Sequence, residues 1–133
     1  MCSKFSSFYF IMASDLLLFV NEEEKIVLHI ELNADSASSL IFFIAYASIK
    51  QTEGFYEDFM VYKTYCMHGA QIIYVTNRKI GDKYLQDFLN KIQNMFYKIL
   101  LHPNIYKNDC IESDEFENFI KQEYVDMITK IEL

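Results

Sequence analysis

The chain contains no tryptophan and only one proline, three glycines and three cysteines in 133 residues. Three glycines scattered along the sequence cannot form the glycine-rich loop that cradles a phosphate group. An odd number of widely spaced cysteines, with no CxxC pair, argues against a disulfide framework and against a zinc site. We therefore expect no cofactor and no metal, and thiols that stay idle in a reducing compartment.

Basic residues are also scarce in this chain. Twelve Lys and Arg stand against nineteen Asp and Glu, so the formal net charge is −7 and the isoelectric point is about 4.9. Affinity for nucleic acid comes mainly from clustered Lys and Arg, and Arg78 with Lys79 is the only adjacent basic pair. We expect neither nucleic acid nor an anionic membrane surface as a partner.

A long hydrophobic run is missing as well. No uninterrupted apolar stretch reaches the roughly 18 residues that a membrane-spanning helix needs. Lys4 and the apolar residues up to Val20 resemble a signal peptide, but Asp15 interrupts them and no small-residue cleavage motif follows. The pieces on either side of Asp15 have the length of strands. We therefore predict no direct membrane insertion.

Apolar residues make up 52% of the chain, which is enough for a single domain over residues 1–133 to close one core. Runs rich in Phe, Tyr, Ile and Val, or alternating between apolar and polar residues, predict strands. These runs lie at 5–13, 16–20, 26–32, 60–67 and 70–76, with a short edge strand near 55–59. His68 and Gly69 are expected to form a two-residue hairpin turn.

The alternation is clearest between residues 26 and 32. The even-numbered positions there are all apolar, whereas the odd-numbered positions hold Val27, His29 and Glu31. This pattern is typical of a half-buried strand with the even-numbered side chains facing the core. We expect His29 on the more polar side of that strand.

Three stretches with helical spacing of apolar residues predict helices, at 36–49, 82–101 and 114–131. Asp82 is expected to cap the second helix, and Asp114 with Glu117 fits a capping box for the third. The order of elements predicts an α+β fold. We expect an antiparallel sheet of four to five strands with one helix on one face and two on the other.

The first of these helices is unusual because it has no charge, proline or glycine. Its apolar residues form two stripes. The first consists of Leu40, Phe43, Ile44 and Ala47, and the second consists of Ile41, Phe42, Ala45 and Ile49. A helix that is apolar all round needs cover on both sides, and this chain has one sheet to offer. We predict that the second stripe is an interface for a protein partner, with this chain's own loops as the alternative cover.

Catalytic patterns are absent from the sequence. His29, His68 and His102 stand far apart, and no Ser or Cys lies in a nucleophile motif. The acidic residues 22–24 are expected to form a solvated turn. We predict no catalytic residue. Because 17% of the residues are aromatic, a module that binds a small hydrophobic ligand in an aromatic cavity stays open as an alternative.

Three stretches are similar to a known family: SSFYFIM at 6–12, LIFFIAYASI at 40–49, and the tail at 87–120. Together they resemble the sedlin family, subunit 2 of the trafficking protein particle (TRAPP) complex, which has a longin-like fold. The tail combines an amphipathic helix, a loop and the start of a last helix. Its resemblance depends on Pro103, Tyr106, Ile111, Ser113 and Phe116.

This resemblance implies a non-enzymatic adaptor in a multi-subunit tether for ER-to-Golgi transport, cytoplasmic and peripheral to those membranes. Its partners would be other subunits of the tethering complex, and the same apolar patch would permit weak self-association. Residues 16–24 depart from the family pattern and are interpreted as an insertion or an elongated hairpin between the first two strands. Another longin-like trafficking subunit is the alternative identity.

Overall fold

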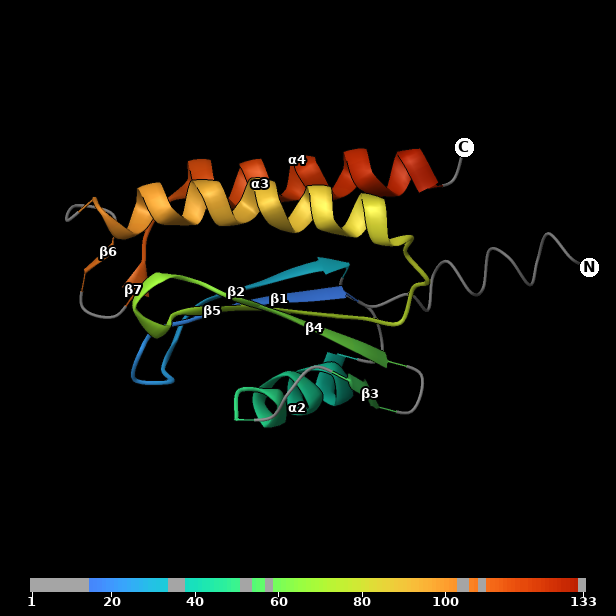
Figure 1. The fold of residues 1–133 in the computed structure, drawn as a ribbon, viewed down its shortest axis with the longest axis horizontal. Coiled ribbons are helices and arrows are strands. Elements are labelled where there is room, and N and C mark those ends of the chain that lie inside the picture. The colour runs from blue at the N-terminus through green and yellow to red at the C-terminus, as the bar shows by residue number, and fades with distance from the viewer. Residues whose placement is uncertain are drawn as a thin grey trace, which may run out of the picture.

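In a computed structural model of the chain, a five-stranded antiparallel sheet lies between one helix on one face and two helices on the other (Figure 1). The structure describes residues 15–33, 38–50, 54–56, 59–102, 106–107 and 110–131. In chain order the elements are β1 (Asp15–Val20), β2 (Ile26–Asn33), α2 (Ser38–Ser48), β3 (Gly54–Tyr56), β4 (Phe59–Tyr65), β5 (Gln71–Thr76), α3 (Asp82–Leu100), β6 (Tyr106–Lys107), β7 (Cys110–Ile111) and α4 (Asp114–Ile131). The predicted α+β class and longin-like arrangement are confirmed.

Strand β1 lies at the centre of the sheet, whose strand order is β2-β1-β5-β4-β3. All six of its residues are buried, because helices cover both faces of the sheet at this position. Leu16, Leu18 and Val20 point toward α2, whereas Leu17 and Phe19 point toward α3 and α4. A strand covered on both faces has apolar residues at consecutive positions, as the run LLLFV does.

Residues 16–24, interpreted from the family pattern as an insertion or an elongated hairpin, form most of β1 and the turn that leads to β2. Residues 16–20 belong to the central strand, and the connection to β2 is a short turn held by the Asn21 side chain. The Asn21 amide oxygen accepts hydrogen bonds from the N–H groups of Glu23 at 2.9 Å and Lys25 at 3.0 Å. The strand predicted at 5–13 lies outside the described residues, so β1 is the first strand described.

Strand β2 does not keep the strict alternation that the sequence predicts. Phe19 is paired with Leu28, but Val20 is paired with Ile26, so Val27 is an extra residue in a β-bulge. The bulge lets Val27 and Leu28 both pack on the α3–α4 side, while Ile26 packs on the α2 side. His29 is exposed, as expected.

The hairpin between β4 and β5 has the two-residue turn predicted from the sequence. His68 and Gly69 both have positive φ, 60° and 82°, and the Ala70 N–H donates to the Met67 carbonyl oxygen at 3.3 Å. Two central residues with positive φ characterise the type I′ turn, which matches the twist of a hairpin. The short edge strand β3 is also present and pairs with β4.

Helix α3 has the predicted apolar stripe on its buried side, but neither long helix is capped by the expected residue. Gly81 is the N-cap of α3, and Asp82 is the first residue inside the helix. At the start of α4, the Ser113 hydroxyl accepts a hydrogen bond from the Phe116 N–H at 3.1 Å. Ser113 therefore caps α4 in place of Asp114, which places an acidic residue in the first turn, where the helix dipole favours it.

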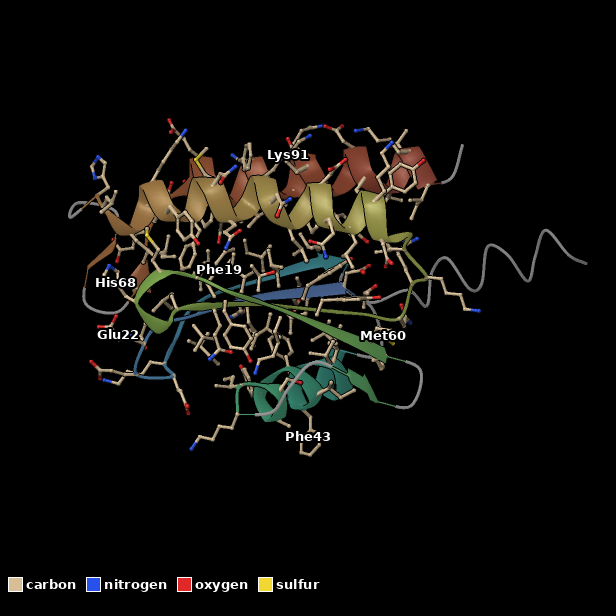
Figure 2. The ribbon with its side chains drawn as sticks, in the orientation of Figure 1. Phe19, Glu22, Phe43, Met60, His68 and Lys91 are labelled. Carbon is tan, nitrogen blue, oxygen red and sulfur yellow. The ribbon has the colours of Figure 1, made fainter. Side chains whose placement is uncertain are left out.

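Aromatic rings fill the layer between the sheet and the two long helices. The ring of Phe19 lies 4.9 Å from that of Phe96 on α3 and 5.2 Å from that of Phe116 on α4, measured between centroids. Figure 2 shows Phe19 between the sheet and these helices. Tilted pairs at this distance are favourable beyond the area that they bury, so this cluster joins all three elements.

Candidate interaction surface

Among the described elements, helix α2 is the one that covers its face of the sheet. Its inward side chains are Ile41, Ile44, Ala45 and Ser48, at positions i, i+3, i+4 and i+7 of one helix face. Ile41 is 2% exposed and Ala45 is fully buried. The Ser48 hydroxyl donates to the Ile44 carbonyl oxygen at 2.7 Å, so its burial leaves no unpaired donor.

The predicted outward stripe of Ile41, Phe42, Ala45 and Ile49 is therefore wrong for Ile41 and Ala45, which pack on the sheet. Phe42 and Ile49 lie at the boundary, half-buried against the same core cluster. The error arose because a helix without charges does not mark its outer side by polarity. Size decides the orientation instead: the small Ala45 and Ser48 allow a close approach to the strands.

Two aromatic side chains occupy the outer side of α2. Phe43 is 70% exposed and Tyr46 is 48% exposed, and Figure 2 shows Phe43 directed away from the sheet. The half-buried ring of Phe42 lies 5.8 Å from the ring of Tyr46 and meets the ring of His29 edge-on at 5.4 Å. We call Phe42, Phe43 and Tyr46 the α2 outer face.

Sequence reasoning missed both exposed residues of this face. Phe43 was assigned to the opposite stripe, and Tyr46 to neither. The only signal available was that bulky aromatic residues fit a flat sheet less closely than Ala and Ser do. A phenyl ring left in water forgoes roughly 1.5–3 kcal/mol of favourable burial, so a partner that covered Phe43 would gain much of that free energy.

Charged residues stand at the C-terminal end of α2 and not along it. The Lys63 ammonium, from β4, donates to the Ile49 carbonyl oxygen at 3.2 Å, where the negative end of the helix dipole favours a cation. Burial lowers the pKa of Lys63, although the nearby Glu24 carboxylate opposes the shift. Lys50 and Glu24 form an exposed ion pair at 3.7 Å. These contacts hold the end of the helix and leave its outer face uncharged.

A buried polar centre lies on the other side of the sheet, at the start of β1. The carboxylate of Asp15, which is 1% exposed, accepts hydrogen bonds from the hydroxyls of Tyr74 (2.8 Å), Thr76 and Tyr124. Arg78 Nε lies 3.2 Å from Asp15 Oδ2 and forms a salt bridge with it. We call these five residues the Asp15 centre.

Burial and the charge of Asp15 keep the two tyrosine hydroxyls of this centre protonated. Burial, and next the negative charge of Asp15, raise the pKa of Tyr74 and that of Tyr124 well above the ordinary value. Burial tends to lower the pKa of Arg78, but the neighbouring Tyr124 and Asp15 outweigh this effect and raise it. Both tyrosines therefore act as donors to a carboxylate that Arg78 neutralises.

The sequence contained a weak signal for this centre. Asp15 interrupts an apolar run, and a charged residue in such a place needs buried partners. Those partners lie up to 109 positions away in the chain. Nothing in the local sequence identifies Tyr74 or Tyr124 among the ten tyrosines. The Asp15 centre therefore could not be predicted.

Little other chemistry is found in the part of the chain that the structure describes. Searched there, no group of three or more His, Cys, Asp or Glu could hold a metal ion. Cys66 is half-buried and Cys110 exposed, both with free thiols, and burial raises the pKa of Cys66. None of the described helices is both long and apolar enough to cross a membrane.

The chain matches no known family model and no curated protein. Its resemblance to sedlin therefore depends on the three quoted stretches and on the arrangement of the sheet. Of those stretches, 6–12 lies outside the described residues, and 40–49 corresponds to α2 and the turn that follows it.

Proposed function

We propose that this protein is a non-enzymatic subunit of a TRAPP-type tethering complex in ER-to-Golgi transport, and that it binds another subunit through the α2 outer face. The observation that carries the proposal is the exposure of Phe43 and Tyr46 on an uncharged helix that covers one face of a longin-like sheet. The protein would act in the cytoplasm, at the surface of these membranes, through its neighbours in the complex.

The chemistry of this face suits a protein partner. Aromatic side chains are enriched in the buried centres of protein interfaces, where a few of them supply most of the binding free energy. Phe43 and Tyr46 are three positions apart and lie on the same side of α2. The Phe42 ring behind Tyr46 is already packed, so part of the surface is rigid before a partner binds, which lowers the entropic cost of association.

Another longin-like trafficking subunit is the alternative identity. The described sheet and the exposed aromatic residues of α2 suit either subunit.

A test is affinity purification from cells followed by mass identification of the partners. The variant Phe43→Asp/Tyr46→Asp is expected to lose its main partner, because it places two charges in the interface. The matched control is Tyr84→Asp/Val125→Asp, which alters two exposed residues on the α3–α4 layer and should retain that partner. Circular dichroism checks that both variants fold. Retention of every partner by the folded α2 variant would refute the proposed surface.

The identified partners test the proposed complex separately. Recovery of tether subunits with the unaltered protein, and their loss from the α2 variant, supports both the complex and the surface. Recovery of a different set of partners that is still lost from the α2 variant would keep the surface and reject the tethering role.

A further inference from the structure

The Asp15 centre joins three elements that are remote in the sequence. Asp15 begins β1, Tyr74 and Thr76 belong to β5, and Tyr124 lies in the middle of α4. The hydrogen bonds to Asp15 span 59, 61 and 109 positions. Tyr124 thus connects the C-terminal helix directly to the end of the central strand.

The other described contacts of α4 with the core are apolar. The buried residues of α4 other than Tyr124 are Phe116, Ile120, Met127 and Ile128. Packed elements can move past each other by one helical turn, after which apolar side chains form new contacts. A hydrogen bond to a buried carboxylate has a fixed position and is lost by such a shift.

The position of α4 determines a feature of the outer surface. A groove of about 290 Å³ runs between the two long helices. Its lining residues come from both helices: Lys91, Asn94, Met95 and Lys98 from α3, and Phe119 and Glu123 from α4. Glu123 directly precedes Tyr124 and forms an ion pair with Lys91 at 3.4 Å. Figure 2 shows Lys91 on the side of this layer away from the sheet.

We propose that the Asp15 centre is a latch that fixes the register of α4, and that it thereby builds the α3–α4 groove on the opposite side of the helix layer. With the latch closed, Tyr124 is bound to Asp15 and Glu123 lies opposite Lys91. With the latch open, α4 shifts or detaches while the sheet keeps its strands. The latch and the groove are coupled through α4 itself, because Tyr124 contacts Asp15 and the preceding residue, Glu123, lines the groove.

Hydrogen–deuterium exchange read by mass spectrometry tests the latch. Tyr124→Phe removes one hydroxyl and preserves the ring, so the chain is expected to fold. Loss of a hydrogen bond to a charged group should make the amides of α4 exchange about tenfold faster, whereas β1 and β5 change little. Unchanged exchange in α4, or the same acceleration in every element, would overturn the proposal.

Two matched variants separate a latch from general stabilisation. Tyr74→Phe removes a hydroxyl that donates to the same carboxylate from the sheet, and it should not accelerate α4 selectively. Tyr97→Phe removes a hydroxyl on α3 that accepts a hydrogen bond from Gln93 at 2.8 Å, and it should leave α4 unchanged. If Tyr74→Phe frees α4 as much as Tyr124→Phe does, the hydroxyl on α4 has no special role and the latch is refuted.

Discussion

The two helical layers of this protein cover the same sheet in opposite ways. On one side, α2 is a single helix of 11 residues with no charge and with aromatic rings on its outer surface. On the other side, α3 and α4 have 19 and 18 residues, share an aromatic core with Phe19, and present charged side chains such as Lys91 and Glu123 outward.

This difference indicates how the two sides relate to solvent. The α3–α4 layer has an ion pair between Lys91 and Glu123 on its outer surface and a hydrogen bond from Tyr124 to Asp15 beneath it. The α2 layer is apolar on both sides, because Ile41, Ile44 and Ala45 are buried on its inner side and Phe43 and Tyr46 are exposed on its outer side. Its outer side has the composition of an interface centre, which is why we place partner binding there.

The largest expected effect comes from breaking the polar contact of the α3–α4 side. Asp15→Ala removes the ion-pair partner of Arg78 and the acceptor that three hydroxyls share. Removal of one partner of a buried ion pair costs about 3–5 kcal/mol. Urea denaturation should show this loss in the free energy of unfolding. A loss below about 1 kcal/mol would mean that the centre contributes little to holding α4 on the sheet.

Alkaline pH should weaken the same centre less than the Asp15→Ala substitution does, because Thr76 and Arg78 stay in contact with Asp15. In the unfolded chain a tyrosine loses its proton near pH 10, at about its ordinary pKa, whereas folding raises the pKa of Tyr74 and Tyr124. Their contribution to stability is therefore full below about pH 10 and declines as the pH rises above it.

The measurement is the free energy of unfolding between pH 8 and 11, compared with that of the double variant Tyr74→Phe/Tyr124→Phe. Subtracting the two curves removes the effects of lysines and of other tyrosines. The difference between the curves should shrink as the pH rises. A constant difference would contradict the raised pKa values.

The next largest effect is expected for Ile41, and comparing it with Phe43 tests which side of α2 faces the sheet. Ile41→Ala should lower the free energy of unfolding by about 2–4 kcal/mol, because it opens a cavity in the core. The control Phe43→Ala, on the same helix, should change it by less than about 0.5 kcal/mol, since the ring is exposed. Thermal unfolding of both variants gives the comparison, and equal effects would refute the orientation of α2.

The smallest effect concerns the start of α4. Ser113→Ala removes the side-chain acceptor for the Phe116 N–H and should cost about 1 kcal/mol. Asp114→Ala removes only a favourable charge near the helix N-terminus and should cost less, about 0.3–1 kcal/mol. Chemical denaturation distinguishes the two, and a larger loss for Asp114→Ala would restore that residue as the cap.

Much of the fold could be predicted because it depends on local patterns. The stripe in α3, the turn at His68 and Gly69, and the covering of the sheet by one helix and two all follow from spacing and turn chemistry. The bulge at Val27 could not be predicted, since it arises from the register with β1 and not from the sequence of β2.

The candidate sites were harder to predict than the fold. Helix α2 was singled out because a run without charges is visible in the sequence, but the orientation predicted for it was wrong for Ile41 and Ala45. That orientation depends on how closely each side chain fits the strands below, and hydropathy does not record this fit. The Asp15 centre depends on contacts between distant segments, which a single sequence does not reveal.

The pairing of β1 with β5 also bears on how the molecule assembles. β1–β2 and β4–β5 are hairpins that can form early from neighbouring residues, but Leu17 of the first meets Tyr74 of the second along one seam. The chain between Leu17 and Tyr74 must close into a long loop before this seam can form. Closing such a loop costs conformational entropy and slows the folding of sheet proteins. We expect the two hairpins to form first and their union along β1 and β5 to limit the rate of folding.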